Sequence, residues 1–166
     1  MATYSLPHFS ELDTNNVEEY YDVEIEFNGH GIQIDLNFEN KIIDTKRLEI
    51  AKEFIMNIAE YDRKNKELIE EDYANEDCDT VKTYVEHYLE YFDKEELANF
   101  IDTENESISA ETQLMKSLRL VRMGLYPDSD DNFATFDYSI DPDTTDHLVV
   151  IFTHSSGEMN YMTMES

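Results

Sequence analysis

The chain has 166 residues, of which 40% are hydrophobic, and its 39 acidic and 12 basic side chains give a formal net charge of −27. This length and apolar content predict a single folded domain over residues 1–166 that needs neither a disulfide nor a metal. The charge argues against nucleic acid and an anionic membrane surface as partners, because phosphate groups are bound by clustered Lys and Arg side chains.

The first residues contain no basic side chain and no apolar run of signal-peptide length. The longest apolar run, residues 148–152, is far too short to cross a bilayer. Cys78 is the single cysteine, so no intramolecular disulfide can form. Together these features predict a cytoplasmic protein.

Residues 20–38 predict a β-hairpin. Apolar side chains alternate with polar ones along both halves of the segment, which is the period of a strand with one buried and one exposed face. Asn28 and Gly29 lie between the halves and form a dipeptide typical of a two-residue hairpin turn.

The outward side chains of this hairpin are mainly acidic. A two-residue turn would set Asp22 opposite Asp35, whereas a four-residue loop through Gly31 would set Glu24 opposite Asp35. Either register places two carboxylates across from each other, and residues 1–40 contain no Lys or Arg to offset them. The candidate protein-binding face therefore consists of Asp22, Glu24, Glu26, Asp35 and Asn37.

Helical patterns occupy the middle of the chain. Apolar side chains at helical spacing predict one long helix or two consecutive helices over residues 44–73, and another helix over 80–92. A capping box at 93–96 opens a short helix that continues to residue 101. Ser109 can cap a further helix through Met123.

Three strands are predicted near the C-terminus, over residues 136–140, 148–152 and 159–164. Strands followed by helices and then strands again favour an α+β fold, in which an antiparallel sheet carries about four helices on one face. The sequence leaves open whether the hairpin and the later strands form one five-stranded sheet or two smaller ones.

Residues 112–124 contain three basic and no acidic side chains, and these are Lys116, Arg119 and Arg122. On the predicted helix, their spacing places all three on one face, where they could bind a carboxylate or phosphate. The alternative is structural: they could neutralise an acidic neighbour such as Glu104, Glu106 or Glu111. The excess of acidic residues favours the structural alternative.

No arrangement of residues indicates a catalytic centre, a cofactor site or a metal site. His87 and Glu90 could share one face of a helix as a pair of metal ligands, but the sequence supplies no clear third ligand. An ordinary, partly exposed helical histidine is the favoured interpretation of His87.

Four segments, at residues 6–9, 20–29, 32–39 and 85–90, together resemble a bacterial family of small acidic cytosolic proteins whose function is unknown. They read Leu-Pro-His-Phe, Tyr-Tyr-Asp-Val-Glu-Ile-Glu-Phe-Asn-Gly, Ile-Gln-Ile-Asp-Leu-Asn-Phe-Glu and Val-Glu-His-Tyr-Leu-Glu. The resemblance covers roughly residues 5–92. It supports the fold prediction and implies no catalytic residue.

The favoured functional hypothesis is a non-enzymatic module that binds a basic protein surface through its acidic sheet face, as immunity proteins bind basic toxin domains. A second hypothesis is an enzyme or small-ligand domain with a site near His87 or near the three cations of residues 112–124. A third is a structural protein that self-associates through the strand at 148–152, so the chain would be a monomer or a homodimer.

Overall fold

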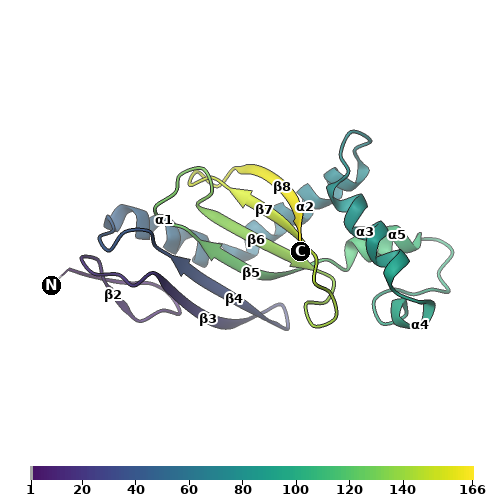
Figure 1. Cartoon of the computed structure of the whole chain (residues 1–166), viewed down its shortest axis with the longest axis horizontal. Helices are drawn as coiled ribbons and strands as arrows, with labels where there is room; N and C mark the ends of the chain where they lie inside the picture. The colour runs from purple at the N-terminus through teal and green to yellow at the C-terminus, as the bar shows by residue number, and fades with distance from the viewer. Residues whose placement is uncertain (1) are drawn as a thin grey trace.

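The structure is a computed structural model that describes residues 2–166. Its centre is a six-stranded sheet in the order β3-β4-β5-β6-β7-β8 (Figure 1). The strands are β3 Tyr20–Phe27, β4 His30–Asn37, β5 Arg119–Leu125, β6 Ala134–Ser139, β7 Leu148–Thr153 and β8 Met159–Glu165. A separate two-stranded sheet joins β1 Thr3–Ser5 to β2 Glu11–Asp13.

The α+β class is confirmed, but the prediction of an antiparallel sheet is wrong at one pairing. β4 and β5 run parallel, whereas every other neighbouring pair in the large sheet is antiparallel. After β4 the chain passes through the helical region and returns beside β4 in the same direction, and a parallel pair requires such a long crossover. One mixed sheet therefore contains both the hairpin and the C-terminal strands.

The β3–β4 hairpin has the register that its turn residues favour. Asn28 and Gly29 have positive φ angles of 51° and 82°, as a two-residue turn of this kind requires. Asp22 lies directly opposite Asp35. The first of the two predicted registers is thus confirmed.

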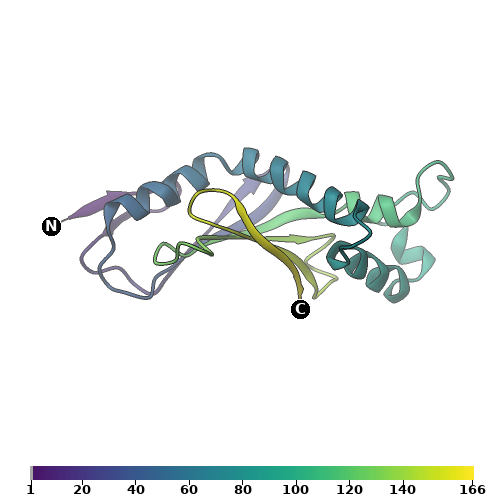
Figure 2. The same cartoon turned by 90° about the horizontal axis from the view of Figure 1, so that it is seen from above.

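Within residues 2–166 there are five helices: α1 Thr45–Met56, α2 Ile58–Ala74, α3 Thr80–Tyr91, α4 Lys94–Leu97 and α5 Ala110–Lys116. Only α1 and α2 cover a face of the large sheet, whereas α3, α4 and α5 stand at one end of it (Figures 1 and 2). The prediction of about four helices on one face is therefore wrong in their placement. A capping box at Asp93 opens α4, as predicted.

The predicted helix over residues 109–123 ends early, at Lys116. The Ser117 hydroxyl donates to the carbonyls of Gln113 and Phe100, at 3.0 and 3.1 Å, and residues 119–125 form β5. A bulge between Leu120 and Arg122 interrupts the two-residue period of this strand, so its apolar side chains also fit a helical spacing. β5 pairs with β4 on one side and with β6 on the other, so its backbone N–H and C=O groups have hydrogen-bond partners on both sides. These bonds favour the strand over the helix.

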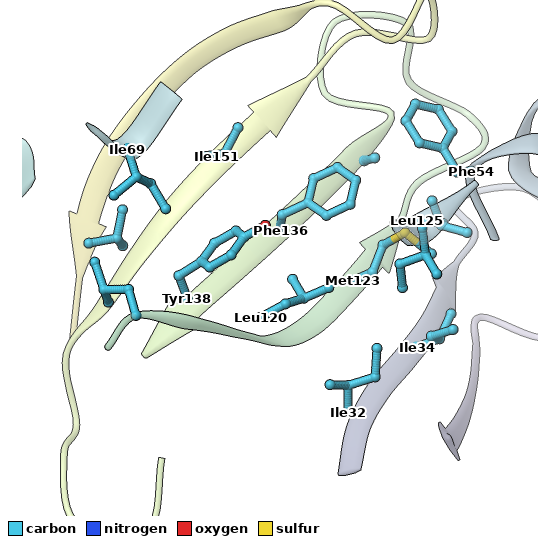
Figure 3. Close-up of a cluster of buried hydrophobic side chains, with 14 of the residues drawn as sticks. Ile32, Ile34, Phe54, Ile69, Leu120, Met123, Leu125, Phe136, Tyr138 and Ile151 are labelled. Carbon is cyan, nitrogen blue, oxygen red and sulfur yellow. The ribbon is translucent and has the colours of Figure 1, made fainter. Parts of the chain in front are cut away.

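The core lies between the sheet and the two covering helices (Figure 3) and continues into the buried sides of α3 and α5. Phe54 of α1 stacks on Phe133 at 5.5 Å and on Tyr61 of α2 at 4.6 Å. The buried hydroxyl of Tyr138 donates to Asp62 of α2 at 2.8 Å. Because the apolar side of the sheet faces these helices, the opposite side carries its polar side chains.

Candidate functional site: the open face of the sheet

The side of the sheet that faces away from α1 and α2 is here called the open face (Figure 2). Strand alternation and register place a mixture of acidic, amide and aromatic side chains on it. Its residues are Tyr20, Asp22, Glu24 and Glu26 of β3, Gln33, Asp35 and Asn37 of β4, Arg122 and Gly124 of β5, Thr135 and Asp137 of β6, Val150 and Phe152 of β7, and Tyr161 and Glu165 of β8.

Asp22, Glu24 and Glu26, here called the acidic strip, lie along β3 at the edge of the sheet. All three side chains are exposed. Among the described residues, none of the three takes part in an ion pair or a side-chain hydrogen bond. The strip is therefore a row of carboxylates whose charge the chain itself does not offset.

Asp35, on the neighbouring strand, is in the opposite situation, with 0% of its surface exposed. Arg122 donates to both of its oxygens, from Nε at 2.6 Å and from NH2 at 2.8 Å. The side-chain amides of Asn37 and Gln33 donate to it as well, at 2.6 and 3.2 Å. Asp35 and Asn37 are thus committed to an internal network and do not belong to the accessible acidic surface.

Arg122 links Asp35 to two further groups. Its NH1 donates to Asp137 at 3.2 Å and its NH2 donates to the Tyr126 hydroxyl at 3.1 Å. Burial alone would lower the pKa of Arg122, but the hydrogen bonds to Asp35 and Tyr126 and the charges of Asp35 and Asp137 raise it. The guanidinium therefore stays charged, and each of its three nitrogens donates at least one hydrogen bond.

Gly124 makes room for this guanidinium. A Cβ at position 124 would lie 2.8 Å from the Arg122 Cζ and closer still to NH2. The guanidinium therefore rests directly on the glycine backbone, and a side chain at position 124 would displace it from Asp35.

Beyond Arg122 the open face is hollowed by a pocket of about 390 Å³. Its lining includes Asp137, Tyr126, Phe152 and Glu165. Burial is the main cause that raises the pKa of Asp137, and Arg122 only partly opposes it, while Glu165 and Asp35 add to the increase. Phe152 stacks on Tyr161 with ring centroids 4.4 Å apart, so this side of the face is aromatic as well as acidic.

The three cations predicted to share a helix face do not share one: Arg122 lies apart from Lys116 and Arg119, which line a common pocket. Arg122 points into the Asp35 network, while Lys116 ends α5 and Arg119 begins β5 at the end of the sheet. The prediction is wrong because the helical spacing does not continue past Lys116. Neutralisation of an acidic neighbour is confirmed for Arg122, but the neighbour is Asp35, 87 residues away in sequence.

His87 lies in a second pocket, of about 430 Å³, between α3 and the β6–β7 loop. Its ring centroid is 4.3 Å from that of His147, whose Nδ1 is 2.7 Å from Asp146. The hydrogen bond from His147 is the main cause that lowers the pKa of Asp146. Within residues 2–166 no group of three or more His, Cys, Asp or Glu side chains is placed to hold a metal.

Sequence reasoning misses the participants that long-range pairing brings in, namely Gly124, Tyr126, Asp137, Phe152 and Glu165. Asp137 carries the clearest available signal, because it stands between the apolar Phe136 and Tyr138 at an outward strand position. No local signal links it to Arg122, since the two meet only through the register of β5 and β6.

No helix of the described residues is both long and apolar enough to cross a membrane. No protein-family model, curated protein or solved structure matches the sequence. The resemblance to a bacterial family of unknown function therefore stays a prediction.

Proposed function

We propose that the protein is a non-enzymatic binding module whose open face meets a basic protein surface. The observation that carries this proposal is the contrast between Asp35, which receives an internal cation, and the acidic strip, which receives none. Exposed carboxylates side by side repel one another, and a partner that supplies Lys or Arg would relieve this repulsion.

The net charge extends the effect beyond contact distance. At −27 the chain attracts a basic partner before the two surfaces touch, which speeds association and makes it sensitive to salt. The acidic strip would then determine where on the surface the partner binds, because its carboxylates follow each other along one edge of the sheet.

The remainder of the open face has side chains suited to an interface. Tyr20 and Tyr161, at opposite edges of the sheet, are 48% and 44% exposed. Tyrosine is enriched at interfaces because it offers a large apolar ring together with a polar group. Tyr20 is held in place by Gln33, whose amide donates to its hydroxyl at 2.8 Å.

The Arg122 network supports binding over catalysis at this face. Four of the five N–H donors of the guanidinium already have acceptors within the protein, so at most one is left to stabilise a developing charge on a substrate. Its role is to neutralise Asp35 inside the sheet, which leaves the acidic strip as the dominant charge of the face.

The proposal is tested by affinity capture from an extract of the native host at low and at high salt. The wild-type chain is compared with the triple variant Asp22→Asn, Glu24→Gln, Glu26→Gln. We expect the wild type to retain a basic protein at low salt and to release it at high salt, and we expect the triple variant to retain much less of it.

A matched control removes the same charge elsewhere. The variant Glu71→Gln, Glu76→Gln, Asp77→Asn also replaces two Glu and one Asp, all exposed and located at the end of α2 and in the loop that follows. It should capture the partner as the wild type does. Equal loss in both variants would show that total charge alone matters and would contradict a role for the strip.

A further inference from the structure

A third pocket, of about 240 Å³, lies at the end of the sheet beside the β3–β4 turn and α2. We call it the cationic pocket, because its lining includes His30, Lys66, Lys116 and Arg119. Asp62 is the one acidic residue in that lining. This composition is the reverse of the chain as a whole, in which 39 acidic residues outnumber 12 basic ones.

Asp62 neutralises one cation of the pocket, Lys66, and leaves the other two, Lys116 and Arg119, without a counter-charge among the residues that the structure describes. Its Oδ1 accepts the hydrogen bond from the buried Tyr138 hydroxyl, and its Oδ2 lies 3.4 Å from Lys66 Nζ. Among residues 2–166, neither Lys116 nor Arg119 forms an ion pair.

Arg119 differs from the other three arginines of the chain. Arg47, Arg63 and Arg122 each form an ion pair with a nitrogen–oxygen distance of 2.6 Å. Arg119 has no such partner, and its NH1 is buried without any hydrogen-bond acceptor in the described part of the chain. A buried donor of a charged group that lacks an acceptor is destabilising, and in folded proteins such a donor is usually satisfied by a ligand, an ion or an ordered water molecule.

We propose that the cationic pocket binds a small oxyanion, of the phosphate or carboxylate type, between Arg119 and Lys116. Lys66 lies at the same pocket and offsets the charge of Asp62, so the pocket keeps the positive charge of Lys116 and Arg119. Guanidinium and ammonium groups make charge-assisted hydrogen bonds to oxyanions, and the anion would give Arg119 the acceptor that the chain does not. The size of the pocket suits a small ion or a single terminal group.

The net charge of −27 does not prevent this binding. Charges more than about 8–10 Å away are largely screened at physiological salt, whereas cations that line a partly desolvated pocket act on an anion at contact distance. The site is independent of the proposed function, because its lining shares no residue with the acidic strip.

The test follows the Nε–H signals of the arginine side chains by two-dimensional NMR. The chain has four arginines, so four signals are expected, and the Arg119→Lys variant identifies the one from Arg119. Inorganic phosphate or acetate is titrated at constant ionic strength, with chloride as the balancing anion. We expect the Arg119 signal to shift in a saturable way, while the signals of the three ion-paired arginines stay in place.

Two lysine variants locate the site. Lys116→Met should weaken binding about tenfold, as expected for the loss of one charge-assisted contact. Lys41→Met, which removes an exposed lysine outside the pocket lining, should leave the affinity unchanged. Both substituted side chains are exposed, so both variants should fold.

The two anions distinguish the sources of the ligand. Saturation by phosphate alone indicates a phosphate or phosphoryl group, and saturation by acetate indicates a carboxylate such as a peptide C-terminus. If neither anion shifts the Arg119 signal, or if Lys116→Met binds as tightly as the wild type, the proposal is wrong.

Discussion

Asp22 and Asp35 are the same residue type, lie directly opposite each other on neighbouring strands and point to the same face of the sheet, yet their environments differ completely. Asp22 is exposed on the edge strand β3 and has no partner among the described residues. Asp35 is fully buried one strand further in and holds a guanidinium with both oxygens. Which carboxylates remain available for a partner is thus decided by the strand beside them.

The cation that separates the two aspartates comes from β5. β5 lies beside β4 on the side away from β3, and its register sets Gly124 opposite Asp35, so Arg122, two residues before Gly124, reaches Asp35 from the inner side. β3 is an edge strand, so Asp22 has only β4 as a neighbour. An edge strand rich in carboxylates also discourages unwanted strand pairing with other chains. The contrast between the two positions defines a series of experiments.

The largest effect is expected from Asp35→Ala. The change leaves Arg122 partly buried without its main partner, and breaking a buried ion pair from one side typically costs about 3–5 kcal/mol. The measurement is the free energy of unfolding from urea titration. Asp22→Ala serves as the control and should change it by at most about 0.5 kcal/mol. Equal losses from both substitutions would contradict the assigned difference.

A smaller loss is expected from Gly124→Ala. The added methyl group would collide with the Arg122 guanidinium and push it away from Asp35, which should cost about 1–3 kcal/mol. In an Arg122→Met background the collision is removed, so the same glycine substitution should cost clearly less. A double-mutant cycle of unfolding free energies measures this, and strict additivity would show that Gly124 does not act through Arg122.

Asp137→Asn should alter the pH dependence of stability. Burial raises the pKa of Asp137 in the folded protein above its ordinary value near 3.8, with Arg122 opposing and Glu165 and Asp35 reinforcing the increase. The folded state therefore binds this proton more tightly, and the wild type loses stability as pH rises through the window above that ordinary value. The variant lacks this loss. Its free energy of unfolding, relative to that of the wild type, should therefore increase as pH rises. A constant difference between their unfolding free energies across the window would contradict the raised pKa.

The smallest effect on stability is expected from the triple variant of the acidic strip, Asp22→Asn, Glu24→Gln, Glu26→Gln. These side chains are exposed and unpaired, and removing like charges from neighbouring positions relieves repulsion. The midpoint of thermal unfolding should therefore stay the same or rise slightly. A marked decrease would mean that the strip supports the fold, and loss of binding in this variant could no longer be assigned to charge.

Local patterns predict much of this fold. The hairpin, its turn, the capping box of α4 and the last three strands all follow from residues that are close in sequence. β5 is different, because Leu114, Leu118 and Val121 fit a helix as well as Leu120, Met123 and Leu125 fit a strand with a bulge. Only the pairing with β4 and β6 removes this ambiguity, and pairing over such distances leaves no local signal.

The candidate site divides in the same way. Two-residue periodicity is sufficient to place Asp22, Glu24 and Glu26 on one exposed face. It places Asp35 on that face as well, but the burial of Asp35 depends on Arg122, Asn37 and Gln33 gathering around it. The error over β5 therefore also conceals the neutralisation of Asp35.

The most direct test of the central claim is the rate at which this protein associates with a basic protein recovered in the affinity capture, measured over a range of salt concentrations. For the wild type and for the control variant Glu71→Gln, Glu76→Gln, Asp77→Asn, the rate should fall steeply with salt, because screening removes the attraction. For Asp22→Asn, Glu24→Gln, Glu26→Gln, the rate at low salt should be lower and its salt dependence shallower. Identical rates and salt dependence in all three proteins would show that the acidic strip is not the surface that the partner recognises.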